Sequence, residues 1–220
     1  MKSHIEKYFS AADVDRIIAA VKEAESKTSA EVVPYVVPRS DEYEEATWRG
    51  ATLAGSLTLL AFVLLNVFTE VWLSRGVVEA ALLTLGASLA GAALCHFVPP
   101  LKRFFSGKEL MEHRVEQRAA NAFLAEEVFN TRDRTGVLLF LSLLERRVVV
   151  LGDAGINAKV RQSDWDEIVK TITKGMEDDR PAAGLVEAIR QCGGLLQRHG
   201  VMIRDDDRDE LGDKLRTSET

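Results

Sequence analysis

The chain has 220 residues, of which 34 are acidic and 28 are basic, so its formal net charge at pH 7 is −6. This charge argues against a general nucleic-acid binder, because such proteins gain affinity by neutralising phosphates with basic side chains. The two cysteines, Cys95 and Cys192, lie far apart in the sequence and suggest neither a disulfide framework nor a metal knuckle.

Residues 1–46 predict a helix followed by a strand and form the first part of a soluble domain. Ser10 followed by Asp13 is typical of a helix start. Residues 31–37 (EVVPYVV) are rich in β-branched and aromatic side chains and predict a strand, which Pro34 assigns to a sheet edge or a bulge. The first ten residues (MKSHIEKYFS) lack the apolar stretch of a secretory signal. We therefore expect the first apolar run, at residues 50–69, to act as its own insertion signal into a membrane.

Two stretches without a charged residue follow, at residues 50–69 and 80–101. A bilayer core is about 30 Å thick and a helix rises about 1.5 Å per residue, so about 20 residues cross it. The sequence therefore predicts two transmembrane helices, over about residues 50–69 and 79–98, within a hairpin segment at residues 47–101. The alternative is a helical hairpin buried in a soluble core.

Basic residues near the two spans predict the orientation of the hairpin. The two ends of the hairpin carry five of them, namely Arg39, Arg49, Lys102, Arg103 and Lys108. The linker carries Arg75 together with Glu70 and Glu79. The positive-inside rule then places both termini and the soluble domain in the cytoplasm, with the hairpin in the inner (plasma) membrane. Trp48 and Trp72 are expected at the two interfaces, and Pro99 with Pro100 is expected to end the second helix.

Small residues predict how the membrane helices pack. Gly86, Ala87, Ala90 and Gly91 form overlapping small-xxx-small pairs, and Ala51 with Gly55 forms another. Such residues let helix backbones approach closely in lipid. A homodimer through Gly86, Ala90 and Gly91 is one hypothesis, and a helix that is simply rich in alanine and glycine is the alternative.

Residues 102–202 predict the second part of the soluble domain. We expect an amphipathic helix around residues 111–123, two strands at residues 136–144 and 147–151 with a turn at residues 145–146, a helix capped by Ser163, and a last helix that begins at Pro181. Residues 203–220 are acidic and lack an apolar period, which predicts a flexible tail. The predicted fold class is α/β, with helices packed on the faces of a small sheet.

Three segments carry a family resemblance. Residues 28–41 (TSAEVVPYVVPRSD), residues 135–150 (TGVLLFLSLLERRVVV) and the following Leu151-Gly152 resemble the TPM domain. The resemblance implies an α/β/α sandwich with a small mixed sheet, here in a bacterial membrane-associated subgroup with two helices inserted after the first strand. The family includes thylakoid-lumen proteins of photosystem II repair. Some members are described as acid phosphatases and others as binding calcium through loop carboxylates, so the resemblance implies one of these two activities. The lack of a secretory signal and the predicted cytoplasmic domain depart from the lumenal members.

Candidate chemistry is confined to loop carboxylates. The sequence contains no phosphate-binding loop, esterase elbow, zinc-protease motif or C-x-x-C pair, and its four histidines form no i, i+4 pair. It therefore indicates no catalytic residue and no cofactor-binding residue. Asp133, Asp153 and Asp164 lie beside predicted strand or helix ends and could together bind Ca²⁺ or Mg²⁺, with Arg134 or Arg146 steadying a phosphate. The alternative is that these aspartates form only local hydrogen bonds in turns and at helix starts.

Two functions from different classes follow. The first is an integral inner-membrane protein whose TPM-like domain binds partners in the cytoplasm, in assembly or quality control of membrane complexes. Its partners would be membrane lipid and a membrane protein, and a nucleic acid is not expected. The second is a metal-dependent phosphatase that uses the loop aspartates. In a weaker third hypothesis, the hairpin belongs to a larger membrane complex whose other subunits hold the activity.

Overall fold

The computed structural model describes residues 5, 8–68, 76–203 and 210–218. It divides into two compact units, one formed by Met1–Asp41 with Glu112–Thr220 and the other by Glu42–Met111. A short helix at Pro99–Ser106, which the sequence analysis did not predict, belongs to the second unit. The linker residues Glu70, Trp72 and Arg75 lie outside the described residues.

The first unit is built around a mixed four-stranded sheet of order β3-β2-β1-β4. β1 pairs in parallel with both β2 and β4, and β2 pairs antiparallel with β3. The strands are β1 (Glu31–Val37), β2 (Gly136–Ser142), β3 (Arg147–Gly152) and β4 (Arg216–Thr217). The β2–β3 hairpin confirms the predicted pair of strands, although the turn begins two residues earlier than expected, at residue 143. Arg146 closes this turn with a φ of +52°.

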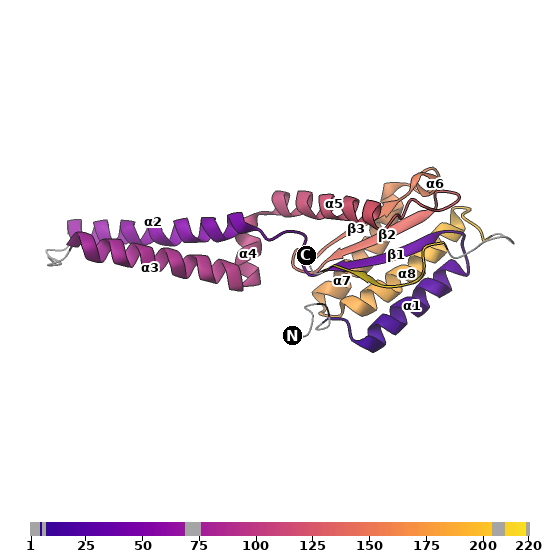
Figure 1. Cartoon of the computed structure of the whole chain (residues 1–220), viewed down its shortest axis with the longest axis horizontal. Helices are drawn as coiled ribbons and strands as arrows, with labels where there is room; N and C mark the ends of the chain where they lie inside the picture. The colour runs from indigo at the N-terminus through magenta and orange to yellow at the C-terminus, as the bar shows by residue number, and fades with distance from the viewer. Residues whose placement is uncertain (1–4, 6–7, 69–75, 204–209, 219–220) are drawn as a thin grey trace. The chain divides into compact units, whose positions relative to one another are not determined.

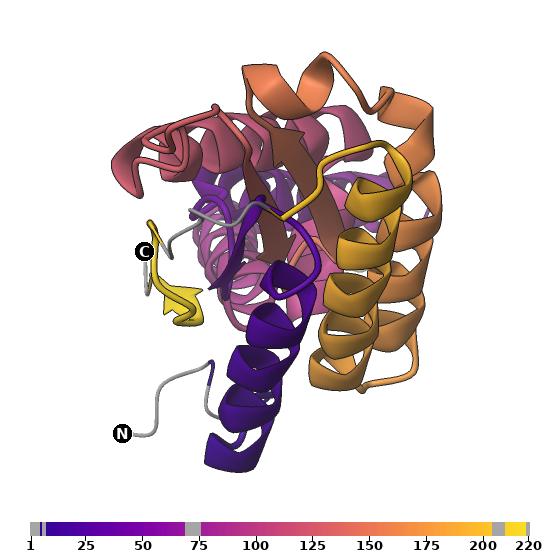
Figure 2. The same cartoon turned by 90° about the vertical axis from the view of Figure 1, so that its right-hand side faces the viewer.

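Helices cover both faces of this sheet (Figures 1 and 2). One face packs against α1 (Ala11–Glu25), α7 (Asp166–Glu177) and α8 (Pro181–Arg198), and the other packs against α5 (Lys108–Ala125). Alternate β2 residues enter the two cores: Leu139 and Leu141 face α1 and α8, whereas Leu138 and Phe140 face α5. The α/β/α sandwich with a small mixed sheet is confirmed.

Local signals account for most helix ends. Ser10 caps α1 through a reciprocal capping box with Asp13, and Pro181 occupies the first turn of α8. The prediction that Ser163 caps the next helix was wrong. Residues 162–165 form a 3₁₀ turn, in which Asp164 accepts the N–H of Arg161 at 2.9 Å, and α7 begins only at Asp166. The four-residue helix α6 (Ala154–Asn157) was not predicted.

The C-terminal segment differs from the expected flexible tail. Residues 204–209 and 219–220 lie outside the described residues, but residues 210–218 lie along β1 and include β4. The sequence analysis missed this strand because two residues of pairing leave no period to detect.

The second unit contains the two apolar helices, α2 (Glu44–Phe68) and α3 (Gly76–Phe97), packed side by side (Figure 1). Both are long and apolar enough to cross a membrane. α2 begins before the predicted span, and α3 ends just before Pro99, as expected. Pro99 and Pro100 then open a further short helix, α4 (Pro99–Ser106), because proline is well suited to a first helical turn.

Small residues line the contact between α2 and α3. A Cβ atom added to Gly91 would lie 2.6 Å from the carbonyl oxygen of Gly50, and one added to Gly55 would lie 2.3 Å from Oγ of Ser88. Gly50, Gly55, Gly91 and Cys95 are the buried residues of this seam. Gly86, in contrast, has no heavy atom within 4 Å of an added Cβ, and Ala90 is exposed. Gly91 therefore serves the contact within one chain, and the dimer through Gly86, Ala90 and Gly91 stays a prediction.

We expect Gly91→Leu to separate the two helices, because its side chain would overlap the backbone of Gly50. Cys95 is 2% exposed in this seam, so separation should raise its rate of reaction with a membrane-permeable maleimide by about tenfold or more in detergent. Gly86→Leu is the matched control and should leave the rate unchanged. Cys192, which is fully buried in the other unit, serves as the internal reference. Equal labelling of Cys95 in the two variants would contradict this packing.

Candidate functional site

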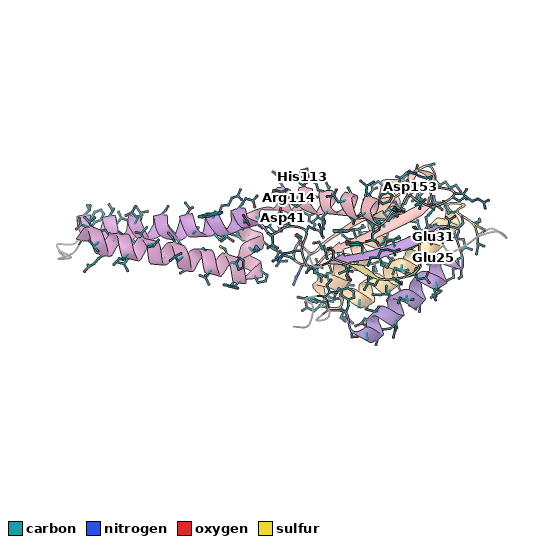
Figure 3. All side chains as sticks on the ribbon, in the orientation of Figure 1. Glu25, Glu31, Asp41, His113, Arg114 and Asp153 are labelled. Carbon is teal, nitrogen blue, oxygen red and sulfur yellow. The ribbon has the colours of Figure 1, made fainter. Side chains whose placement is uncertain are left out.

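The sheet gathers acidic side chains at one end, where β1 and β2 begin and β3 finishes. Glu31 opposes Gly136 in the parallel pair, and Gly152 opposes Val137 in the antiparallel pair, so Asp153 follows β3 at the end where β1 begins. We call this end, with Glu25, Glu31, Asp133, Asp153 and Asp213, the acidic end. Figure 3 labels Glu25, Glu31 and Asp153 there.

The loops that carry Asp133 and Asp153 are joined by main-chain hydrogen bonds. The N–H of Asp153 donates to the carbonyl of Gly136, and the N–H of Gly155 donates to the carbonyl of Arg134, both at 2.9 Å. A Cβ atom on Gly155 would lie 2.3 Å from the carbonyl oxygen of Asp133, so this close approach requires glycine. The sheet thus brings two of the three predicted aspartates into neighbouring loops.

The carboxylate of Asp153 is bound by other groups of the protein. The side chain of Asp153 is 6% exposed and forms an ion pair with Arg134, in which Nε lies 2.7 Å from Oδ2. Oδ1 accepts one hydrogen bond from Nη2 of Arg134 at 3.0 Å and another from the N–H of Ala154 at 2.7 Å, which caps α6. The guanidinium of Arg134 lies 5.5 Å from the ring centre of Phe129. The ion pair balances the charge of the buried carboxylate, and the hydrogen bonds fix the loop.

Asp164 belongs to a separate network in the 3₁₀ turn. The backbone N–H of Arg161 stabilises its carboxylate and lowers its pKa below the usual value. Nε2 of His199 lies 3.8 Å from the same carboxylate, and Nδ1 of His199 lies 3.1 Å from the carbonyl oxygen of Lys159. Within the described residues, no group of three or more His, Cys, Asp or Glu side chains is placed to hold a metal ion. A metal site formed by Asp133, Asp153 and Asp164 stays a prediction.

A second acidic group was missed by the sequence analysis. Glu25 ends α1 and Glu31 begins β1, and the two lie close to Asp213 of the C-terminal segment. Burial, followed by a hydrogen bond with Asp213, raises the pKa of Glu25 to about 9. Glu25 therefore carries a proton at neutral pH, which lets two carboxyl groups share a hydrogen bond. No sequence pattern links Asp213 to Glu25, since the docking of the C-terminal segment creates the contact.

Lys22 and Cys192 complete the surroundings of Glu25. Nζ of Lys22 lies 3.5 Å from the carboxylate of Asp213 and balances its charge. Cys192 of α8 is fully buried, and this burial raises the pKa of its thiol to about 12. The thiol is thus neutral and unsuited to act as a nucleophile.

The opposite end of the sheet carries a buried serine–glutamate network. Ser142 donates from its hydroxyl to Glu145, and Ser40 donates from its hydroxyl to Oγ of Ser142 at 2.8 Å. The other carboxylate oxygen of Glu145 accepts the N–H of Ser40 at 2.8 Å. Ser142 is fully buried, so this network holds the segment after β1 against the β2–β3 turn rather than presenting a nucleophile.

Comparison with known proteins shows a similarity to the TPM domain in sequence and to one solved structure in fold. The profile of the TPM domain matches residues 94–195. Among solved structures, the chain is similar to the BA42 protein of the psychrophilic bacterium Bizionia argentinensis, with 19% sequence identity and a TM-score of 0.59 over 97% of this chain and 98% of that chain. No curated protein matches the sequence. At this identity, the structural likeness concerns the fold alone.

The buried carboxyl of Glu25 predicts a pH dependence of stability. Its folded pKa of about 9 lies above the ordinary value of 4.5, so the folded state binds more protons than the unfolded state between these values. The free energy of unfolding should therefore fall as pH rises through this range, by up to about 1.4 kcal/mol per pH unit. Glu25→Gln should flatten the decline between about pH 6 and pH 9, because the amide stays neutral while its oxygen still accepts the N–H of Val32. Denaturant unfolding in detergent measures the slope.

Glu23→Gln is the matched control on the same helix. Lys27 and Arg190 lower the pKa of Glu23, so its carboxyl does not titrate above pH 6 and the variant should keep the slope of the native chain. An unchanged slope in the Glu25→Gln variant would refute the protonated carboxyl.

Proposed function

We propose, from the match of residues 94–195 to the TPM domain, that this chain is an integral inner-membrane protein that presents a TPM-like domain to the cytoplasm as a binding module. This module would act in assembly or quality control of membrane complexes, with membrane lipid and a membrane protein as partners. The α2–α3 hairpin would be the anchor, and the sandwich would be the part that recognises partners. Each part of the proposal has its own support.

One observation carries the membrane assignment: the hairpin has its small side chains inside and its large apolar side chains outside. Its buried positions include Gly50, Gly55, Gly91 and Cys95. The exposed positions hold leucines, valines and phenylalanines, among them Leu57, Leu65, Phe68, Leu82 and Leu89. A water-soluble hairpin has the reverse pattern, because each large apolar side chain gains roughly 1.5–3 kcal/mol by leaving water. Small residues at the contact and large residues outside are typical of helices in lipid.

This pattern disfavours the alternative of a hairpin buried in a soluble core. Almost all of the most apolar window of each helix is exposed, so the protein itself does not cover these surfaces. An apolar surface of this extent on a soluble monomer would promote association. Lipid is the solvent that suits it.

Basic residues at the base of the hairpin support the cytoplasmic orientation. Arg49 donates to the carbonyl of Phe105 at 2.7 Å, and Nζ of Lys102 donates to the carbonyl of Glu42 at 2.8 Å. Both contacts keep positive charge beside the ends of α2 and α4. Arg103 and Lys108 add further charge at the same base, and the positive-inside rule favours its retention in the cytoplasm.

A binding role is supported by how the polar side chains of the sandwich are used. Asp153 pairs with Arg134, Asp164 with Arg161, and Glu145 with two serines, so the acidic groups mainly stabilise loops. The alternative, a metal-dependent phosphatase with Ca²⁺ or Mg²⁺, is favoured by one observation. The loops of Asp133 and Asp153 meet at the acidic end, where Asp133 is exposed and oxygen ligands suit these ions. In that case the Arg134–Asp153 pair would have to open to admit a cation.

The orientation can be tested by changing charge without disturbing the fold. Lys102 is 4% exposed and bonded, so it is left in place. Arg103→Glu with Lys108→Glu should weaken or invert the topology, read as the accessibility of the soluble domain to protease in sealed inner-membrane vesicles of known sidedness. Arg103→Lys with Lys108→Arg keeps the charge and should behave like the native chain. Unchanged protection in the glutamate variant would argue against the orientation.

The binding role and the phosphatase differ in a direct assay. The purified full chain in detergent should show no turnover of a generic phosphomonoester with Ca²⁺ or Mg²⁺ above that of a buffer blank. Turnover that depends on metal and is lost in Asp133→Ala, but retained in Asp15→Ala on the surface of α1, would establish the phosphatase instead.

A further inference from the structure

Residues 210–218 lie on the side of β1 that faces away from β2 (Figure 1). β4 pairs with β1 over two residues only, with Arg216 opposite Tyr35 and Thr217 opposite Val36. Leu215 packs against the core on the α1 side, and Leu211 packs against the core on the α5 side. The segment therefore covers one strand edge and extends both cores by one leucine.

On this side, the backbone of β1 has few N–H groups that could donate to a longer neighbouring strand. The N–H of Val32 is bonded to Oε1 of Glu25 at 2.9 Å. Alternate residues of a strand turn their N–H groups to the same side. The backbone nitrogens of Pro34 and Val36 therefore face the same side as that of Val32. Pro34 has no N–H, which leaves Val36 as the donor for a neighbouring strand. This explains why β4 is short, and it means that side chains decide what binds here.

Polar contacts near the surface hold the segment. Nε of Arg216 lies 2.8 Å from a carboxylate oxygen of Glu126, and Arg118 donates to the hydroxyl of Ser218 at 2.9 Å. The N–H of Glu210 donates to Glu31 at 3.1 Å. The side chains of Arg216 and Glu126 are 16% and 32% exposed, and Asp213 adds its contacts with Lys22 and Glu25. Only two residues of the segment pair with β1, so a partner segment that makes the same contacts can compete for the site.

The surface beneath the segment is apolar. Val32 and Val36 face one core, and Val33 and Tyr35 face the other, and all four are buried while the segment is in place. Departure of the segment would uncover this strand edge. Exposed edges of sheets are the sites to which extended peptides add as strands.

We propose that this side of β1 is a docking site for a segment of a partner protein that turns at a glycine, as this chain does at Gly212, and then pairs with β1 over a short strand, and that residues 210–218 occupy the site as an intramolecular competitor. The inference rests on the proposed binding role and specifies its partner. The partner segment would run parallel to β1 and carry two leucine-sized side chains four residues apart, followed directly by a basic residue, as Leu211, Leu215 and Arg216 do. Glu126 selects the basic residue. The covalent link gives the chain's own segment a high effective concentration, so the site stays closed until a stronger segment arrives.

A labelled peptide with the sequence of residues 210–218 (ELGDKLRTS) tests the site by fluorescence anisotropy. The full chain in detergent is compared with a variant that lacks residues 210–220. The variant should bind the peptide at least about tenfold more tightly than the native chain, because its site is empty. Equal affinity for the two proteins, or no binding to the shortened variant with native secondary structure, would overturn the proposal.

A full-length variant covers the case in which the shortened chain does not fold. Arg216→Glu reverses the charge that meets Glu126 and should release the segment, so that this variant also binds the peptide more tightly than the native chain. A peptide with the same Arg216→Glu change should bind neither protein, whereas one with Lys214→Glu, at an exposed position, should bind like the original. Indifference to both peptide changes would overturn the assigned contacts. A phosphatase activity would refute the proposed function and leave these binding results unaffected.

Discussion

The close approach of two helix backbones at Gly50 and Gly91 is the constraint on which the apolar unit depends. Because glycine backbones touch there, the large side chains have no room between the helices and point outward. An outward apolar surface is stable only in an apolar solvent, and in such a solvent close backbone packing replaces the hydrophobic effect as the source of association. The close packing within the hairpin and its outward apolar surface are therefore two results of the same choice of small residues.

The apolar unit is inserted into the sequence of the sandwich between β1 and α5. The chain leaves after β1, and it returns as α5 to cover the face of the sheet opposite to α1 and α8. The segment after β1 is held by the hydrogen bonds among Ser40, Ser142 and Glu145. Asp41 follows in the same segment, and its carboxylate lies 2.8 Å from Nε of Arg114 on α5. These contacts fix the points at which the domain is interrupted, and the acidic end, which carries Asp133 and Asp153, lies at the other end of the strands.

Much of this architecture could be predicted from residues that act locally. Ser10, Pro181 and the apolar run at residues 136–142 predict their elements because caps, proline and short apolar runs act locally. The helix over residues 99–106 was missed because the Pro99-Pro100 pair was interpreted only as an end, although proline also suits a beginning. Glu25, Glu31 and Asp213 could not be associated, since nothing near Asp213 in sequence indicates a strand. Candidate aspartates were predicted from the loops that carry them, but their partners, such as Arg134 for Asp153, depend on the final packing.

The insertion of the hairpin between β1 and β2 also bears on how the domain is made. Glu31 pairs with Gly136, so residues 38–135 lie between the two central strands. Such remote pairing is slow when the intervening loop is loose, because closing it costs entropy. Here the helices bring Arg49 to within 2.7 Å of the carbonyl oxygen of Phe105, which removes most of the intervening chain from the closure. The hairpin can therefore form from its own contacts before the sheet is completed, which shortens the loop that the pairing of β1 with β2 must close.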